Sequence, residues 1–360
     1  MAPSGVNHPT VLAFERYDPT DESIKWLEEK GVSVLKGHAL WEMPFQRFTE
    51  DELIAKAQGC VALMGASGTR ISRRVMEALP DLRFISKYGI GFDSIDITAA
   101  TELGVLVSNT PNESQIFTVC EHAVALLLAV AKQLGTWTPT FMQKGGWRGL
   151  THSATLRGAT VGIIGLGRIG RGVAQRLTGW EARIIAYDPF LTEAPAGVKL
   201  VGLTELLTKS DFITLHASPS PENYHILNAA AFKQMKQSAY VINTGRGSLI
   251  NYPDLRAALD NGEIAGAALD VFDKEPPSPN DDLFTRPNVI CTPHVGAWTT
   301  DGTQAIGWHA ARNLWGMISG EGHVDEVNPE AREHAEPRRV SGEFYLEPSS
   351  ATGDRRVKVK

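Results

Sequence analysis

The sequence lacks the features that mark several classes of protein. Its 360 residues include three cysteines, Cys60, Cys120 and Cys291, and no two of them have a paired spacing. Isolated cysteines in an odd number argue against a disulfide framework or a zinc ribbon and fit a reducing compartment. The longest uninterrupted apolar run, 123–131, has nine residues, whereas a membrane-spanning helix needs about 20. Residues 1–10 contain no basic segment followed by an apolar one, so we expect no secretory signal.

An excess of positive charge is also missing. The formal net charge is -6, which gives no bulk attraction to nucleic acid or to an anionic membrane. The hydrophobic share of 42% and the charged share of 21% exclude a mainly disordered chain, and the length predicts about two domains. We therefore expect a cytoplasmic protein whose partners are small molecules rather than nucleic acid, membrane or metal.

Short apolar runs alternate with amphipathic segments along most of the chain. The runs that predict strands are 11–14, 32–35, 60–64, 83–86, 160–164, 183–187, 212–215, 240–243, 267–269 and 289–291. Strands that alternate with helices predict parallel sheets and the α/β fold class. An apolar helix is expected over 114–132, after the polar segment 108–112. Residues 332–360 are rich in Arg, Glu, Pro and Ser, and predict a flexible tail, with a docked arm around 344–346 as the alternative.

One glycine motif has the context of a dinucleotide site. Gly165, Gly167 and Gly170 fit G-x-G-x-x-G between a β-branched strand and an amphipathic helix. These glycines permit a tight turn, close approach of a pyrophosphate and close helix packing, and the helix N-terminus attracts phosphate. Asp188 ends the next strand, 18 residues beyond Gly170. A carboxylate there would bind the adenosine ribose and repel a 2′-phosphate, and no arginine adjoins it in sequence, so NAD is favoured over NADP.

Three further segments follow predicted strands, where open α/β sheets bind their ligands. They are 243–247, 270–277 and 292–297. Hydride transfer at a carbon that bears oxygen needs an acid/base, a group that orients it, and a cation for a substrate carboxylate. Histidine, a carboxylate and arginine suit these three tasks. His294, Glu275 and Arg246 are the candidates in these segments.

The glycine motif is followed along the chain by Asp188, Thr-Gly-Arg-Gly, Glu275-Pro and Pro-His294. Motifs of these types in this order resemble the D-2-hydroxyacid dehydrogenase family, and the likeness spans roughly residues 10–330. That family includes phosphoglycerate, hydroxypyruvate, D-lactate and phosphite dehydrogenases. The resemblance implies that Arg246 binds the substrate carboxylate, that His294 is the acid/base and that Glu275 is its partner. The other residues that we assign to the cofactor are Arg168, Ile169, His216, Thr244, Asp270 and Ala297.

The resemblance also predicts the architecture. We expect two Rossmann-like, doubly wound parallel-sheet domains, of which the substrate (catalytic) domain is discontinuous, at 1–107 plus 299–331, and the NAD-binding domain is 108–298. In the first domain the glycine-rich loop 87–93 matches a family segment, in which Ile90 and Gly91 would give backbone N–H groups to the substrate carboxylate. Family members dimerise through the region of the apolar helix and the tryptophan-bearing segment after it, which predicts a homodimer through the NAD-binding domain.

Several positions depart from the family pattern. Ala66 stands where phosphoglycerate dehydrogenases usually carry an arginine that binds phosphate, which makes phosphoglycerate doubtful, although Arg70, Arg73 or Lys87 could supply charge. Trp298 replaces a small residue, and Glu275 counts against formate as the substrate. The expected reaction is NAD-dependent interconversion of a 2-oxo acid and an (R)-2-hydroxy acid. The alternatives are an NAD-sensing binding protein like the corepressors of this fold, and a phosphite dehydrogenase-like enzyme.

Overall fold

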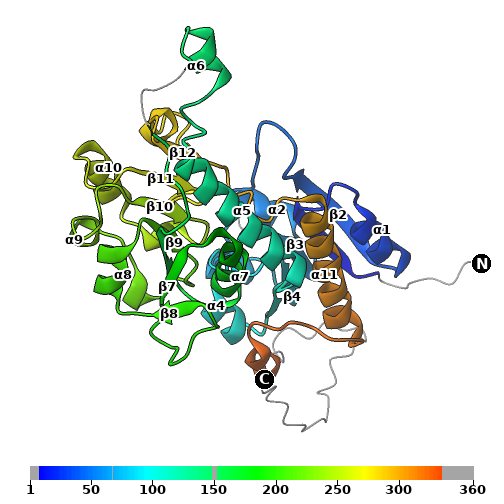
Figure 1. Cartoon of the computed structure of the whole chain (residues 1–360). Coiled ribbons are helices and arrows are strands. Elements are labelled where there is room, and N and C mark those ends of the chain that lie inside the picture. The colour runs from blue at the N-terminus through cyan, green and yellow to red at the C-terminus, as the bar shows by residue number, and fades with distance from the viewer. Residues whose placement is uncertain (1–7, 67, 148–151, 335–360) are drawn as a thin grey trace, which may run out of the picture. The chain divides into compact units, whose positions relative to one another are not determined.

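The computed structural model describes residues 8–66, 68–147 and 152–334 (Figure 1). The chain folds into two compact units. One comprises the chain up to Asn112 and from Thr300 onward, and the other comprises Glu113–Thr299. Each unit is an α/β structure around one parallel sheet, as the sequence predicts.

The sheet of the first unit has the strand order β2-β1-β3-β4-β5, and all its pairings are parallel. The strands are β1 Thr10–Arg16, β2 Ser33–Ala39, β3 Ala62–Gly65, β4 Phe84–Lys87 and β5 Leu106–Ser108. This order is that of flavodoxin-like doubly wound sheets. Because successive strand residues point to opposite faces, Ile85 joins the apolar cluster with Leu53, Val75 and Ala99. On the other face, the Ser86 hydroxyl donates to the Ala310 carbonyl at 2.9 Å.

The helices of the first unit cover both faces of its sheet. Their bounds are α1 Glu22–Glu29, α2 Glu50–Lys56, α3 Arg73–Glu77, α4 Ile97–Glu102 and α11 Thr300–Ser319, and a short 3-10 helix, η5, spans Pro329–His334. Helix α11 packs against β3, β4 and β5 and against α1. It therefore belongs to this unit although it follows the second unit in sequence.

The sheet of the second unit has the order β12-β11-β10-β9-β6-β7-β8, again entirely parallel. The strands are β6 Thr160–Ile164, β7 Arg183–Tyr187, β8 Val198–Leu200, β9 Phe212–Leu215, β10 Tyr240–Asn243, β11 Gly266–Leu269 and β12 Val289–Cys291. Beginning at β6, the chain adds strands first on one side and then, from β9, on the other, so the topological switch point lies between β6 and β9. Ligands bind at the carboxyl ends of the strands at such a point.

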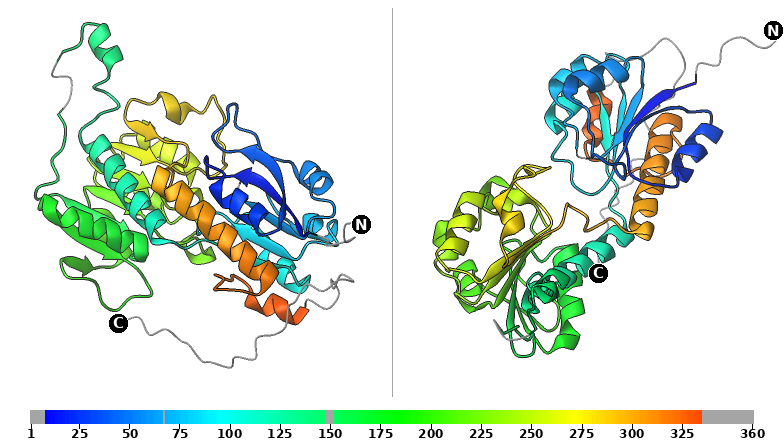
Figure 2. Two further views of the ribbon diagram at one scale, coloured as in Figure 1. Left: turned by 90° about the vertical axis from the view of Figure 1, so that its right-hand side faces the viewer. Right: turned by 90° about the horizontal axis from the view of Figure 1, so that it is seen from above.

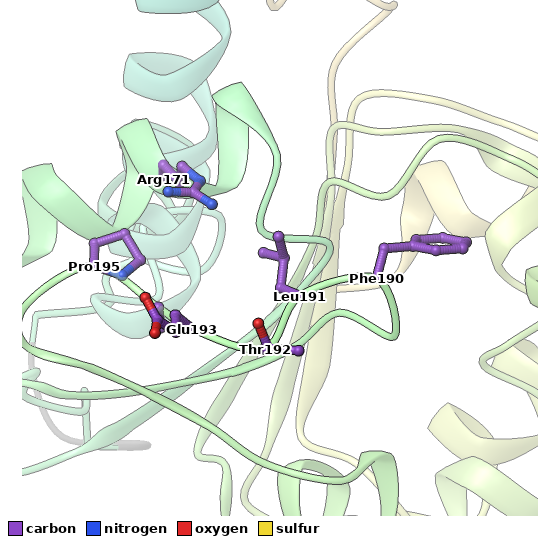
Figure 3. A pocket seen from close by; sticks show the side chains of 7 residues that line it. Arg171, Phe190, Leu191, Thr192, Glu193 and Pro195 are labelled. Carbon is purple, nitrogen blue, oxygen red and sulfur yellow. The ribbon is translucent and has the colours of Figure 1, made fainter. Parts of the chain in front are cut away.

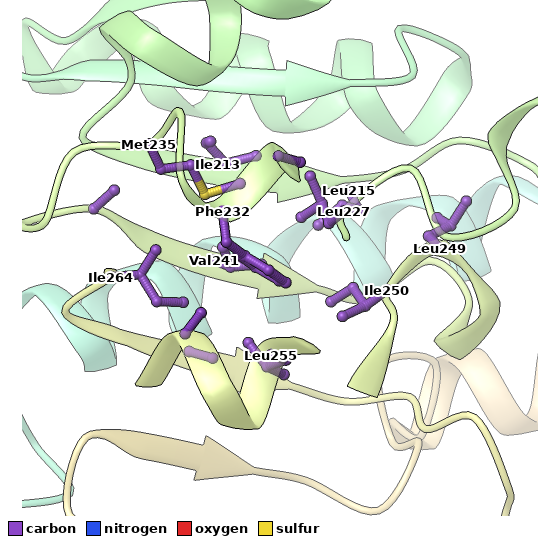
Figure 4. Packing of buried hydrophobic residues seen from close by; sticks show 14 of the residues in the cluster. Ile213, Leu215, Leu227, Phe232, Met235, Val241, Leu249, Ile250, Leu255 and Ile264 are labelled. Atoms are coloured by element: carbon purple, nitrogen blue, oxygen red, sulfur yellow. The ribbon is translucent and has the colours of Figure 1, made fainter. Parts of the chain in front are cut away.

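Two apolar clusters fill the two faces of this sheet, and Figure 4 shows residues of one of them. Figure 2 shows the helices on both sides of this sheet. Val241 belongs to the cluster with α8 Leu203–Lys209, α9 Ala229–Phe232 and α10 Tyr252–Asp260, and its neighbour Ile242 belongs to the cluster with α5 Glu113–Ala131 and α7 Arg168–Leu177. Four short 3-10 helices, η1 to η4, span Thr178–Trp180, Pro221–Asn223, Gly247–Leu249 and Asp282–Thr285. Helix α6, Pro139–Gln143, has no buried residue and projects away from the sheet of its unit in Figure 1.

The structure extends the predicted elements and corrects one of them. Strands β5 and β8 have three residues each and lie outside the predicted runs. Arg332 to His334, placed by the sequence in a flexible tail, belong to η5, where Ala331 is buried; the rest of the expected tail lies outside the described residues.

Helix α5 is long and apolar enough to cross a membrane by length and composition, with a mean hydropathy of 1.6 over 18 residues. It is the one such helix among the described residues. Its buried side chains, among them Leu127 and Val130, belong to the core cluster that it shares with α7 and the sheet. This packing accounts for its apolar composition.

Candidate functional site

The glycine motif forms the turn between β6 and α7. Gly165 has φ +90°, and a Cβ there would lie 2.4 Å from the Ala217 nitrogen. A Cβ on Gly170 would lie 2.1 Å from the Gly165 carbonyl oxygen, so this glycine lets α7 pack onto the turn. A Cβ on Gly167 would meet no atom within 4 Å. The turn is thus closed at Gly165 and Gly170 and open at Gly167, which is the form a pyrophosphate cradle requires.

Arg168 and Ile169 form the first turn of α7, directly after Gly167. The first N–H groups of a helix have no partner within the helix and carry its positive dipole. These two residues therefore lie where the main chain can bind an anion.

Asp188 follows β7, and its carboxylate is held by the main chain. Oδ2 accepts from the Leu166 nitrogen at 2.9 Å and Oδ1 from the Phe190 nitrogen at 3.0 Å. Arg171 donates from Nε to the Leu166 carbonyl at 3.0 Å. An arginine therefore shares a residue of the glycine turn with Asp188, although none adjoins Asp188 in sequence.

A shallow pocket of about 400 Å³ is lined by Arg171 and by the segment that follows Asp188. Its lining residues are Arg171, Phe190, Leu191, Thr192, Glu193, Ala194 and Pro195 (Figure 3). The Phe190 side chain is 90% exposed. The pocket thus brings an aromatic ring and a guanidinium to the ribose end of the expected cofactor groove.

His216 and Thr244 stand at the ends of β9 and β10. The His216 ring lies 2.9 Å from the Thr214 hydroxyl through Nε2 and 3.5 Å from the Thr244 hydroxyl through Nδ1. Burial of the ring lowers the pKa of His216 to about 3, so it is neutral at physiological pH. It contributes hydrogen bonds to this edge of the sheet rather than a charge.

Arg246 lies in a tight turn after β10 that Asn243 organises. The Asn243 side chain accepts from the Gly245 nitrogen at 3.0 Å and donates to the Arg246 carbonyl at 2.9 Å. A Cβ on Gly247 would lie 2.0 Å from the Phe272 carbonyl oxygen. The Arg246 turn is therefore packed directly against the segment that leads to Glu275.

The structure brings Glu275 and His294 together, as the sequence predicts. Glu275 Oε2 lies 2.6 Å from His294 Nδ1, and its Oε1 accepts from the Phe272 nitrogen at 3.0 Å. His294 has φ +54°, a left-handed conformation that is costly for a residue with a Cβ. Its side chain is 48% exposed, so the ring reaches solvent while one of its nitrogens is held by the carboxylate.

Asp270 follows β11 and anchors the loop that carries His294. Its carboxylate accepts from the nitrogens of Val295 and Gly296, each at 2.9 Å, and its carbonyl accepts from the His294 nitrogen at 2.8 Å. Ala297 follows in the same loop and is half-buried. Ala297 is therefore on the loop that carries His294, and Asp270 is hydrogen-bonded to that loop.

His122 is a residue of this site that sequence reasoning missed. The sequence places it on a helix and favours a packing or surface role, yet its Nε2 lies 3.0 Å from the Thr292 hydroxyl and 3.3 Å from Asp270 Oδ1. The helical phase of α5 is the one signal that could have indicated this, because His122 neighbours the buried positions Val119 and Ala123.

The glycine-rich loop of the first unit is fixed within that unit. Gly89 has φ +91°, and its nitrogen donates to the Thr110 hydroxyl at 2.7 Å. The Asn109 side chain donates to the Ile90 carbonyl at 2.7 Å. Ile90 and Gly91 are half-buried, so this part of the main chain is ordered and partly accessible.

This chain is similar to known proteins in both sequence and fold. The family profile described as D-isomer specific 2-hydroxyacid dehydrogenase, NAD binding domain, matches residues 124–296. The D-3-phosphoglycerate dehydrogenase of Methanocaldococcus jannaschii is 39% identical over 318 residues, which are 86% of this chain and 58% of that protein. The chain belongs to the D-isomer specific 2-hydroxyacid dehydrogenase family.

Solved structures are similar in fold to this chain over nearly their whole length. The TT0316 protein from Thermus thermophilus has a TM-score of 0.79 and 30% identity, covering 88% of this chain and 99% of that one. An NADPH-dependent glyoxylate/hydroxypyruvate reductase from Sinorhizobium meliloti has a TM-score of 0.76 and 27% identity, covering 90% and 99%. By contrast, the chain spans just over half the length of the curated relatives it matches.

Proposed function

We propose that this chain catalyses the nicotinamide-dependent interconversion of a 2-oxo acid and an (R)-2-hydroxy acid. The observation that carries the proposal is the 2.6 Å contact between Glu275 and His294, at the carboxyl ends of strands whose switch point holds the glycine turn. Family membership supports the same reaction class.

The acid/base role follows from the geometry of the pair. When bound, the cofactor supplies or accepts the hydride. In reduction, His294 donates a proton to the oxygen of the former carbonyl group, and in oxidation it takes the hydroxyl proton back. Because Nδ1 is held by Glu275, Nε2 is the nitrogen that serves the substrate. The carboxylate stabilises the protonated ring and fixes its orientation.

Arg246 is the proposed partner of the substrate carboxylate, since a guanidinium offers two parallel donors to it. Ile90 and Gly91 are proposed to add main-chain N–H groups, which makes the first unit, 1–107 plus 299–331 in our assignment, the substrate domain. Residues 108–298 would form the NAD-binding domain. Its contacts to the cofactor would come from the glycine turn, Arg168, Ile169, Asp188, His216, Thr244, Asp270 and Ala297.

The substrate that we favour carries no phosphate. Ala66 offers no charge, and Ser67 beside it lies outside the described residues. Arg73 is paired with Glu102 and Glu77, and Lys87 is 2% exposed with its Nζ donating to the Tyr88 carbonyl. Of the three cations that could replace the missing arginine, Arg70 is exposed and has no ion pair or hydrogen bond of this kind among the described contacts.

We further propose NAD as the cofactor, a homodimer formed through the NAD-binding domain, and a cytoplasmic location. Asp188 would penalise a 2′-phosphate by repulsion and by loss of the ribose bond, roughly 30- to 1000-fold in kcat/KM. Arg171 opposes this preference, because it lies by the same turn.

The test measures NADH and NADPH oxidation with glyoxylate, hydroxypyruvate, pyruvate, phosphohydroxypyruvate and branched 2-oxo acids. We expect turnover of an unphosphorylated acid with NADH, and a higher kcat/KM with NADH than with NADPH. Asp188→Ala should bring the two cofactors closer together, and Asp188→Ala/Arg171→Ala should lower kcat/KM for NADPH again. Tight NADH binding without turnover of any acid would contradict the enzyme and favour a sensor.

A further inference from the structure

His122 connects α5 to the ends of two strands. Its Nε2 lies 3.0 Å from the hydroxyl of Thr292, which follows β12, and 3.3 Å from Oδ1 of Asp270, which follows β11. The Asp270 side chain is 2% exposed and the His122 side chain 20% exposed. This is therefore a largely buried polar contact between three elements of one unit.

The distances assign the hydrogens of this contact. The Thr292 hydroxyl lies 2.6 Å from Asp270 Oδ1 and donates its single hydrogen to that oxygen. The Thr292 oxygen can then only accept, so His122 Nε2 carries a hydrogen and donates it. Burial alone would raise the pKa of Asp270, but hydrogen bonds from His122, Thr292 and Val295 outweigh it and lower that pKa. Asp270 is therefore an ionised anchor.

The anchored loop is the one that carries His294. Besides Thr292 and His122, the Asp270 carboxylate binds the nitrogens of Val295 and Gly296. A Cβ on Gly296 would lie 3.0 Å from Asp270 Oδ2 and 3.6 Å from the His122 ring, so the loop lies close against both. A left-handed residue such as His294 keeps its conformation only where its surroundings impose it.

We propose that His122 is a positioning residue for His294, acting through Thr292 and Asp270. The N–H group of His122 holds the Thr292 hydroxyl in the direction that binds Asp270, and Asp270 then fixes the main chain on both sides of the ring that meets Glu275. This inference rests on the proposed function only for the role of His294 as acid/base. The contacts of His122 with Thr292 and Asp270 are observed distances, and their effect on His294 can be measured without turnover.

The experiment compares His122→Leu, His122→Gln, Thr292→Val and Thr292→Ser with the unmutated chain. Gln can restore an N–H donor near Nε2, and Ser retains the hydroxyl. Thr160→Val is the matched control, because Thr160 is a 7% exposed threonine at the opposite end of the same sheet. Two readouts are measured: steady-state reduction with NADH, and the proton NMR resonance of the His294 Nδ1–H bound to Glu275.

We expect His122→Leu and Thr292→Val to lower kcat about 10- to 100-fold, the scale of a small misplacement of a reacting group, with the Kd for NADH changed less than about threefold. The downfield His294 resonance should broaden or move upfield in both. His122→Gln, Thr292→Ser and Thr160→Val should stay close to the unmutated chain in both readouts.

A purely structural role would lower the melting temperature and leave kcat per folded molecule and the resonance unchanged, and that result would overturn the proposal. Equal effects of His122→Gln and His122→Leu on kcat and on the resonance would also overturn the proposal. If His122→Leu does not fold, Thr292→Val decides by the same criteria. If the unmutated chain turns over no 2-oxo acid, the proposed function fails, while the resonance still decides whether His122 positions His294.

Discussion

At the scale of single residues, the charge on Glu275 is expected to support proton transfer by His294. The two side chains meet at 2.6 Å through Nδ1, where a carboxylate orients the ring and stabilises the positive charge that it carries while it holds the proton. Neutralising Glu275 without changing its shape separates the charge from the hydrogen bond.

Glu275→Gln is therefore expected to lower kcat for reduction at least about tenfold, while the Kd for NADH changes less than about threefold. The amide keeps the shape and a hydrogen bond but lacks the charge that stabilises the imidazolium. Glu263→Gln, which lies near the end of α10, provides the control and should leave kcat unchanged. An unchanged kcat in Glu275→Gln would show that Glu275 does not act on His294 through its charge.

The residues that the sequence could predict are those whose role depends on type and position after a strand. Arg246, Glu275 and His294 each follow a recognisable apolar run, and parallel strands bring such positions to one edge. His122 could not be found in this way, because its partners Asp270 and Thr292 lie 148 and 170 residues away in sequence and a histidine on an apolar helix usually has a packing role. Arg171 was missed for a similar reason, since its relation to Asp188 arises only when the turn at Leu166 is folded.

At the scale of elements, the glycines of the turn between β6 and α7 have different expected roles. Gly170 is expected to matter for stability, and Gly167 for binding of the cofactor. Gly170→Ala should lower the stability by roughly 1–3 kcal/mol, because the new Cβ would lie 2.1 Å from the Gly165 carbonyl. Gly167→Ala meets no atom within 4 Å. It should lose less than about 1 kcal/mol of stability, yet weaken NADH binding at least about tenfold by blocking the approach of the pyrophosphate.

Melting temperature and NADH titration of the two variants check this, with Gly179→Ala as the control, since its Cβ also meets no atom within 4 Å. Equal loss of NADH affinity in Gly167→Ala and Gly179→Ala would refute the cradle at Gly167. Full stability of Gly170→Ala would mean that α7 can shift to accept a side chain.

The elements themselves were predictable to different degrees for physical reasons. Strands such as β6 and β9 are buried on both faces and read as continuous apolar runs. Strand β8 has the exposed Lys199 between Val198 and Leu200 and so contains no apolar run. Strand β5 overlaps the short apolar run 105–107, which is not among the predicted strands. The left-handed conformation of His294 leaves no trace in its residue type, because it is imposed by the bonds of the loop to Asp270.

At the scale of the whole molecule, the strand orders show how one fold principle is used twice. Both sheets are parallel and doubly wound, with the order 2-1-3-4-5 in the first unit and a switch point at β6 in the second. The alternation of strands and helices predicted this class, but local patterns contain no information on the order of the strands. The return of the chain to the first unit through α11 was expected from the family resemblance and not from the pattern of that segment.

The last prediction concerns assembly. Leu134, Met142 and Trp147 are 58%, 53% and 75% exposed. Leu134 lies between α5 and α6, Met142 lies on α6 and Trp147 lies after it, and α6 has no buried residue. Exposed apolar side chains along one segment are typical of an interface that a partner copy covers. We therefore expect light scattering at micromolar concentration to give twice the 39.1 kDa mass of the chain.

Leu134→Glu/Met142→Glu should shift the mass toward that of one chain, because burying two carboxylates in an apolar interface is costly. Met43→Glu, at a 90% exposed position in the first unit, should leave the mass of the dimer unchanged. The His294–Glu275 pair and the glycine turn are both formed within one chain, so the dissociated protein should retain NADH binding. A monomer in the unmutated protein, or a double variant that remains dimeric, would exclude this segment as the interface.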